Sequence, residues 1–190
     1  MAAAGRPPGR RRFRRRPRRR RVVRRRGLRL SALTRFSARV HRQTGLDTPA
    51  LPPDRPATVD ARCHRAGDPW PLYASLEPET VWAEWSAATR GAIDPSSERR
   101  RLWRLDVTDM KVIDLRRPEA REGFGIELDA ITGPRRAAQE LAARARDLGA
   151  DGLILPSAAH RGHWNLVVLP AAFPKVRVAG STATRPRPPG

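Results

Sequence analysis

Three residues with chemically useful side chains recur at equal intervals in the middle of the chain. Arg62, Tyr73 and Glu84 are spaced eleven and eleven residues apart, and Glu84 lies between two tryptophans in the segment VWAEW. A carboxylate held against apolar and aromatic surface stabilises a developing positive charge better than one in bulk water, because the local dielectric constant is lower. These residues therefore indicate chemistry in which a cation forms beside Glu84.

Each candidate taken alone also has a plain structural interpretation. A glutamate at the rim of an apolar helix face is commonly solvated or paired with an arginine, and a lone strand tyrosine commonly serves packing. Ser157 follows a proline at the end of a predicted strand, where serine is commonly a turn or cap residue. His160 and His163 in the loop SAAHRGHW are more commonly surface groups than general bases. Only their arrangement in the fold can favour chemistry.

The elements that carry Tyr73 and Glu84 can be predicted from local patterns. PLYAS is a short strand-like run, and the glutamate and proline that follow it favour a helix that runs to about Thr89. On this helix Val81, Trp85 and Ala88 share an apolar arc. We expect Glu84 at the edge of that arc, half-buried beside the core.

The remaining patterns indicate an α+β fold with a mixed sheet and flanking helices. RLWRLDV and KVIDL are predicted as two neighbouring strands, and GLILPS and NLVVLP as two buried strands on either side of the SAAHRGHW loop. GPRRAAQELAARARDLGADG is an amphipathic helix by its 3.6-residue period. FGIELDAITG is predicted as a loop that matches no phosphate-binding glycine motif, so a Rossmann or P-loop nucleotide site is not supported.

The composition allows one hydrophobic core with tails. A chain of 190 residues with 39% hydrophobic side chains buries one ordinary core, and we expect one folded domain over residues 38–179 between disordered tails at 1–37 and 180–190. The first 26 residues contain 14 arginines and no acidic residue, which leaves +6 of the net charge of +20 for the other 164. Most of the basicity therefore belongs to the N-terminal tail.

Three interpretations of the arginine-rich tail stay open: a passive extension, a non-specific binder of nucleic acid or anionic surfaces, and a specific recognition arm. No uninterrupted apolar segment follows it, so export is not predicted. No stretch approaches the roughly 20 apolar residues that span a bilayer, and we expect a soluble cytoplasmic protein. The single cysteine, Cys63, and four scattered histidines predict neither a disulfide nor a metal site.

The order of these pieces resembles the RES-domain family, which is named for an arginine, a glutamate and a serine and includes toxins of toxin–antitoxin pairs. The resemblance covers roughly residues 39–169. It rests on the spacing of Arg62, Tyr73 and Glu84, on the helix that follows LYAS, and on the closing segment DGLILPSAAHRGHWNLVVL.

The family's site residues can be carried onto matching positions of this sequence. ARVHR resembles the opening arginine segment, with Arg39 as the first arginine and Arg42 as its competitor. The second arginine, the tyrosine, the glutamate, the serine and the asparagine after the serine loop match, in that order, Arg62, Tyr73, Glu84, Ser157 and Asn165. The chain departs from the family around the second arginine, where glycine commonly precedes that residue and this chain has Ala61.

The resemblance implies a fold similar to the ADP-ribosyltransferase toxins and an enzyme that consumes NAD. It implies cleavage of the nicotinamide–ribose bond by hydrolysis or phosphorolysis, with NAD as a substrate rather than a cofactor and inorganic phosphate as a potential co-substrate. Transfer of ADP-ribose to a protein is the alternative reaction. Breaking this bond leaves an oxocarbenium-like ribose, which needs a carboxylate near the sugar and cations near the pyrophosphate.

The resemblance also implies a role for each residue. Arg39 or Arg42, with Arg62, would bind phosphate oxygens, which match the guanidinium fork. Tyr73 would pack on nicotinamide or ribose, and Glu84 would bind the ribose and offset the charge of the transition state. The other two are expected to act as follows: Ser157 would bond the ribose or position the glutamate, and Asn165 would contact substrate.

The implied partner is an antitoxin with a helix-turn-helix DNA-binding part that blocks the NAD cleft. Two rival hypotheses stay open. A basic nucleic-acid-binding protein would lose its affinity for duplexes on removal of residues 1–26, whereas the RES interpretation predicts that NAD consumption survives this truncation. An inactive RES-like binding module would release no nicotinamide under any condition.

Overall fold

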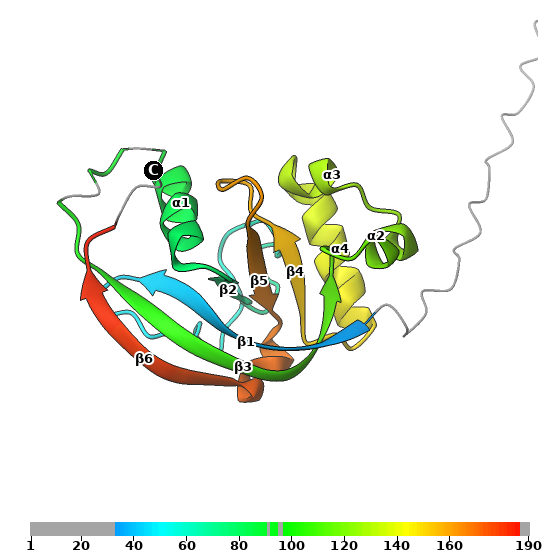
Figure 1. Ribbon diagram of the computed structural model, residues 1–190, viewed down its shortest axis with the longest axis horizontal. Coiled ribbons are helices and arrows are strands. Elements are labelled where there is room, and N and C mark those ends of the chain that lie inside the picture. The colour runs from blue at the N-terminus through cyan, green and yellow to red at the C-terminus, as the bar shows by residue number, and fades with distance from the viewer. Residues whose placement is uncertain (1–32, 91, 95–96, 187–190) are drawn as a thin grey trace, which may run out of the picture.

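The computed structural model describes residues 33–90, 92–94 and 97–186 (Figure 1). Within these ranges the elements in chain order are β1 (Leu33–Thr44), β2 (Leu72–Ser75), α1 (Pro78–Thr89), β3 (Arg100–Asp114), α2 (Pro118–Phe124), α3 (Leu128–Thr132), α4 (Arg135–Asp147), β4 (Gly152–Pro156), β5 (Trp164–Val168), the 3-10 helix η2 (Pro170–Lys175) and β6 (Val176–Thr184).

Strand β3 is the central element of a six-stranded mixed sheet. On one side it pairs with β1 along its length, and on the other with β6 through its first half and with parallel β4 through its last three residues. β5 lies antiparallel between β4 and β2. β2 meets β1 only through the pair of His41 and Ser75. The sheet therefore closes on itself, and it is held together least where β1 meets β2.

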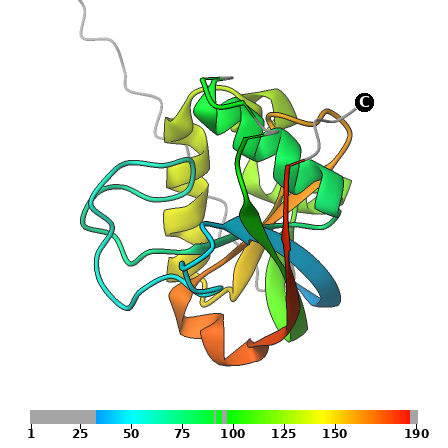
Figure 2. The ribbon, with the colours of Figure 1, turned by 90° about the vertical axis from the view of Figure 1, so that its left-hand side faces the viewer.

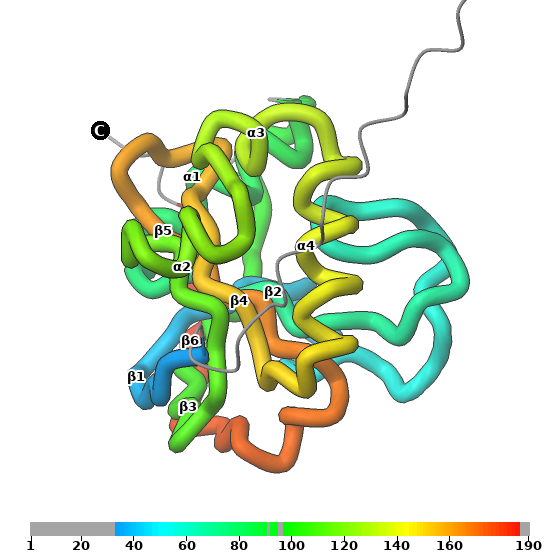
Figure 3. The backbone as a smooth tube through the Cα atoms, turned by 90° about the vertical axis from the view of Figure 1, so that its right-hand side faces the viewer, coloured from blue at the N-terminus to red at the C-terminus, as the bar shows by residue number. Residues whose placement is uncertain are grey.

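The helices lie on two sides of this sheet. In Figure 1, α1 stands apart from the group of α2, α3 and α4, and β4 and β5 lie between them. Figures 2 and 3 show the long connection between β1 and β2 running beside α4. The amide of Gln139 on α4 donates to the carbonyl oxygens of Ala61 and His64, at 2.9 and 3.2 Å. α4 therefore fixes the part of the connection that carries Arg62.

The two-residue period of β4 and β5 divides their side chains between two cores. Leu153 and Leu155 pack with α4, whereas Ile154 packs with the β1 and β3 residues on the other face. In the same way Val167 faces the first core and Leu166 the second. Both strands are therefore buried on both faces, which explains why their sequences are continuous apolar runs.

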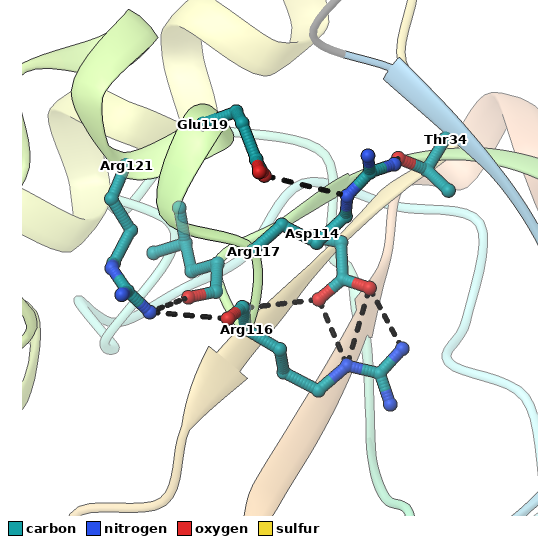
Figure 4. A network of polar contacts seen from close by, with 7 residues as sticks. Thr34, Asp114, Arg116, Arg117, Glu119 and Arg121 are labelled. Atoms are coloured by element: carbon teal, nitrogen blue, oxygen red, sulfur yellow. Dashed lines mark hydrogen bonds and ion pairs between the residues drawn. The ribbon is translucent and has the colours of Figure 1, made fainter.

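The carboxyl end of β3 is fixed by a network of arginines (Figure 4). The buried carboxylate of Asp114 accepts hydrogen bonds from Nε and Nη2 of Arg116, at 2.9 and 2.7 Å. Arg121 on α2 donates to the carbonyl oxygens of Leu115 and Arg116. These contacts anchor α2 beside the ends of the parallel strands β3 and β4, the edge from which Ser157 emerges.

The predictions of α1, α4, β4 and β5 are confirmed, as is the α+β class. Two predictions in the middle of the chain are wrong. RLWRLDV and KVIDL do not form two strands but one, because β1 pairs with both. At the bulge between them, the single β1 residue Ser37 faces two β3 residues, Thr108 and Asp109. Asp109 takes a positive φ of 50° there. FGIELDAITG is not a simple loop, since it contains α3.

The expected domain boundaries at residues 38 and 179 fall inside strands. β1 begins at Leu33, and β6 continues to Thr184, pairing with β3 as far as Arg100. The polar run GSTAT shows no apolar alternation, so only its backbone pairing with β3 identifies it as strand. Disorder predicted over Leu33–Ser37 and Gly180–Thr184 is therefore wrong, and that predicted for residues 1–32 and 187–190 lies outside the described residues.

Candidate active site

A pocket of about 410 Å³ opens where β1 and β2 separate. Its lining residues come from β1, the connection at Ala61 and Arg62, β2, α1 and the start of β5. Val81 and Trp85 of α1 supply an apolar wall. The predicted site residues that line it are Arg42, Arg62, Tyr73, Glu84 and Asn165.

Glu84 is half-buried on α1, as expected, and its carboxylate is held by two neutral donors. The Ser157 hydroxyl and the Asn165 amide each donate to Oε1 of Glu84 at 2.6 Å. Among the described residues no ion pair involves Glu84, although arginine is the commonest charged residue of the chain. The carboxylate therefore faces the pocket with its negative charge uncompensated.

The two donors to Glu84 are themselves fixed by further hydrogen bonds. The Ser157 hydroxyl oxygen is buried and accepts from the backbone N–H groups of Ala159 and His160, at 3.3 and 2.9 Å. The Ser75 hydroxyl donates to Oδ1 of Asn165 at 2.7 Å, which orients the asparagine amide nitrogen toward Glu84. A carboxylate held by such oriented donors keeps one position while a substrate binds and reacts.

Two arginines line the pocket together with Glu84. Nη1 of Arg42 donates to the Tyr73 carbonyl oxygen at 3.3 Å, while its Nε is buried without a partner among the described residues. Burial lowers the pKa of Arg42 to about 10. Nη1 of Arg62 donates to the carbonyl oxygen of Ile131, at the end of α3, at 2.8 Å. Both guanidinium groups keep donors available for an anion in the pocket.

Arg39 does not line the pocket, whereas the alternative, Arg42, does, so the geometry favours Arg42 as the first site arginine and its role stays a prediction. Successive strand residues point to opposite faces, and the three-residue offset puts these two arginines on opposite faces of β1. Arg39 is largely exposed and donates from Nε to the Asp106 carboxylate at 2.9 Å. Arg177 of β6 donates to the same carboxylate, so Asp106 pairs with both arginines on the surface away from the pocket.

Tyr73 holds the connection that carries Arg62. Its hydroxyl oxygen accepts from the backbone N–H of Cys63 at 3.0 Å and lies 2.9 Å from Nδ1 of His64. Burial raises the pKa of Tyr73 well above its usual range and that of Cys63 to about 12. Both groups therefore stay neutral at physiological pH, and Tyr73 offers its ring rather than a charge to the pocket.

Ser75 belongs to the predicted strand PLYAS, but the sequence did not identify it as part of the site. Ser75 is the last residue of β2 and lines the pocket. The two-residue period of LYAS puts it on the same face as Tyr73, and this period is the signal that could have found it. His41 and Gln43 of β1 line the pocket as well, next to Arg42.

No group of three or more metal-ligating side chains occurs among the described residues. In the same part of the chain, no helix is long and apolar enough to cross a bilayer.

Comparison with known families gives one match that covers most of the chain. The model of the RES domain matches residues 33–187, which include all the strands and helices described above.

A curated relative from Mycobacterium tuberculosis, named probable NAD(+) phosphorylase Rv3189, is 34% identical over 135 residues. The matched region covers 70% of this chain and 65% of the relative, so the match leaves about a third of the relative without a counterpart.

Among solved structures, a chain in the crystal structure of the Mycobacterium tuberculosis MbcT–MbcA toxin–antitoxin complex is similar in fold. The TM-score is 0.69 with 25% sequence identity, and the match covers 83% of this chain and 90% of that one.

Proposed function

The chain belongs to the RES domain family, and from this premise we propose that it is an enzyme that consumes NAD by breaking the bond between nicotinamide and ribose. The 34% identical relative named as an NAD(+) phosphorylase supports inorganic phosphate as the acceptor. In that reaction the bond from ribose C1 to the nicotinamide nitrogen breaks, and its electron pair leaves with neutral nicotinamide. A phosphate oxygen forms the new bond to C1, giving ADP-ribose 1-phosphate.

The observation that carries this proposal is the Glu84 carboxylate, which faces the pocket, is held by two neutral donors and forms no ion pair among the described residues. Nicotinamide leaves as a neutral molecule, so positive charge moves onto the ribose as the bond breaks. A fixed carboxylate in a half-buried pocket stabilises that charge in the transition state more than in the ground state, which is the condition for catalysis. Ser157 and Asn165 hold the carboxylate in place without neutralising it, because both are uncharged donors.

We assign the anionic groups of the reaction to the two pocket arginines. Guanidinium forks match phosphate oxygens, and both Arg42 and Arg62 line the pocket. Only one hydrogen bond of the Arg42 guanidinium is seen among the described residues, from Nη1 to the Tyr73 carbonyl oxygen, so its other donors remain for an oxygen of the pyrophosphate or of the attacking phosphate. Tyr73 would then support the ribose or nicotinamide through its ring. No cofactor or metal is required by this scheme.

The test is incubation of the purified protein with NAD, with and without inorganic phosphate, while nicotinamide release and the mass of the ribosyl product are followed. We expect phosphate to accelerate release and ADP-ribose 1-phosphate to form. If ADP-ribose formed instead, and phosphate left the rate of nicotinamide release unchanged, the reaction would be hydrolysis and not phosphorolysis. Nicotinamide release only when a protein acceptor is added would indicate ADP-ribosylation.

Substitution of Glu84 by glutamine tests the central residue. Glu84→Gln keeps the size of the side chain and removes its charge, so we expect kcat to fall on the order of 100- to 1000-fold. Glu140→Gln is the matched control, because Glu140 is exposed on α4 and pairs with Arg136. A Glu84→Gln protein that retained wild-type kcat would refute the catalytic assignment.

We further propose that an antitoxin protein covers this pocket in the resting state. The support is that the similar fold was solved in a toxin–antitoxin complex. A helix-turn-helix part in that partner, and binding of nucleic acid by this chain, stay predictions. The cytoplasm is the proposed location, since NAD is available there. Co-expressed partner protein should suppress both nicotinamide release and growth arrest.

A further inference from the structure

The loop from Ser157 to Trp164 lies along one face of α1 and contacts it at three points. Thr80 and Glu84 are four positions apart on α1 and share one face of the helix, and Glu77 is the extended residue that immediately precedes it. The loop residues that meet them recur every three positions. The three contacts are Ser157 with Glu84 at 2.6 Å, His160 with Thr80 at 3.0 Å, and His163 with Glu77 at 3.6 Å.

The middle contact joins the loop to a buried hydroxyl. The Thr80 side chain has no solvent exposure, and its Oγ1 lies 3.0 Å from Nδ1 of His160 and 3.4 Å from Oε2 of Glu77. A buried hydroxyl that loses its partner costs about 1–3 kcal/mol, so this contact holds the histidine ring in place. Thr80 is one helical turn from Glu84, on the same helix and the same face.

His160 also holds Ser157 directly. Its backbone N–H donates to the Ser157 hydroxyl oxygen at 2.9 Å, which leaves the hydroxyl proton of Ser157 to be donated to Glu84. The His160 and His163 rings stack with their centroids 3.7 Å apart and nearly parallel. The backbone closes the loop, because the N–H of Ser157 donates to the carbonyl oxygen of His163 at 2.8 Å.

We propose that Thr80 and His160 are positioning residues of the active site, which act through Ser157 to fix the Glu84 carboxylate. The proposal rests on the NAD-cleaving function stated above. Neither Thr80 nor His160 lines the pocket, so neither is assigned a contact with substrate. Their role is to keep the Ser157–Glu84 hydrogen bond in one geometry while charge develops on the ribose.

This role predicts a specific kinetic pattern. Substrate binding depends mainly on the arginines and the apolar wall, whereas the Glu84 position matters most in the transition state. Loosening the loop should therefore lower kcat and leave KM for NAD nearly unchanged. A displacement of about 1 Å in a catalytic group can lower the rate on the order of 100-fold. A smaller displacement of Glu84, caused by a loosened loop, should therefore lower kcat about 10-fold.

The experiment compares Thr80→Val, Thr80→Ser and His160→Ala, with Thr89→Val as a control on the same helix. Valine keeps the shape of threonine and removes only the hydroxyl, whereas serine keeps the hydroxyl. Among the described residues the Thr89 hydroxyl bonds only backbone carbonyl oxygens of its own helix, at Trp85 and Ser86. We expect kcat to fall about 10-fold in Thr80→Val and His160→Ala, to recover in Thr80→Ser, and to be unaffected in Thr89→Val.

A double variant separates positioning from a general loss of structure. If Thr80 acts through Ser157, Thr80→Val should lower kcat no further in a Ser157→Ala protein. Independent, additive losses would overturn the proposal, as would a Thr80→Val protein that behaves like the Thr89→Val control.

Amide exchange of His160 tests the same contacts without any assay of activity. Its N–H donates to Ser157, so its exchange should be faster in Thr80→Val than in Thr80→Ser and unchanged in Thr89→Val. Equal exchange in all variants would overturn the positioning role. If the wild-type protein released no nicotinamide, the proposed function would be refuted. The amide-exchange result would still decide whether Thr80 holds the loop.

Discussion

At the scale of single residues, the site holds charged groups that form no ion pair among the described residues. Glu84 receives hydrogen bonds from two neutral groups, and Arg42 keeps a buried donor without a partner among the described residues. Leaving the Arg42 donor unsatisfied costs free energy in the empty protein. The charges suit a substrate with phosphates at one end and a developing cation at the other.

The two arginines of β1 provide a direct comparison. Arg42→Gln removes a cation from the pocket, and since hydrogen bonds to charged groups contribute about 1.5–3 kcal/mol, we expect KM for NAD to rise about 10- to 100-fold. Arg39→Gln removes an exposed partner of Asp106 that does not line the pocket, so it should change KM less than twofold. Steady-state kinetics of both proteins measure this. If Arg39→Gln raised KM for NAD more than Arg42→Gln did, Arg39 would be the first site arginine instead.

At the scale of elements, the position of Ser157 depends on the packing of β4 against β5. The two strands are so close at Gly152 that an added Cβ would lie 2.6 Å from the carbonyl oxygen of Val167. That oxygen belongs to the backbone, so the strands would have to separate to accept a side chain. β4 leads directly into the serine loop, and its spacing from β5 therefore helps to set the site.

Gly152→Ala should lower the free energy of unfolding by about 1–3 kcal/mol, the usual cost of overpacking. Gly123→Ala is the matched control, because Gly123 lies on α2 with no heavy atom within 4 Å of an added Cβ. There alanine should stabilise the helix by about 0.5–1 kcal/mol. Urea unfolding of the three proteins measures both effects, and equal stabilities for the two variants would contradict the close approach.

At the scale of the whole molecule, the basic character and the pocket lie in different parts of the chain. Residues 1–26 hold 14 arginines, whereas the described residues that line the pocket all lie between His41 and Asn165. A run of arginines binds polyanions through charge alone, without sequence specificity. Truncation therefore tests the proposed chemistry and any nucleic-acid affinity separately.

Deletion of residues 1–26 should leave nicotinamide release within about twofold of the full chain, because no described pocket residue is removed. Affinity for duplex DNA should fall sharply and lose most of its salt dependence, since 14 positive charges are deleted. Binding isotherms at two salt concentrations and the NAD assay measure the two properties. Loss of NAD cleavage on truncation would assign the tail to the enzyme itself.

Local patterns in the sequence were sufficient for the parts of the fold whose signal is local. The helix with Glu84 at its apolar edge and the buried strands β4 and β5 follow from periodicity and from proline and glycine at their ends. β3 was divided in two, and β6 was not predicted, because their continuity comes from pairing with distant strands. Backbone pairing leaves no pattern in a polar run such as GSTAT.

The sequence by itself determined the residue types of the site and the spacing of Arg62, Tyr73 and Glu84. Local patterns placed Tyr73 on a strand and Glu84 on a helix, whereas Arg62 lies in the long connection between β1 and β2. Only the tertiary structure decided which β1 arginine faces the pocket, since alternation separates Arg39 from Arg42 but does not say which face is covered. It also decided that Glu84 meets Ser157 and not an arginine. That contact joins residues 73 positions apart, and long-range packing of this kind is not encoded in any local pattern.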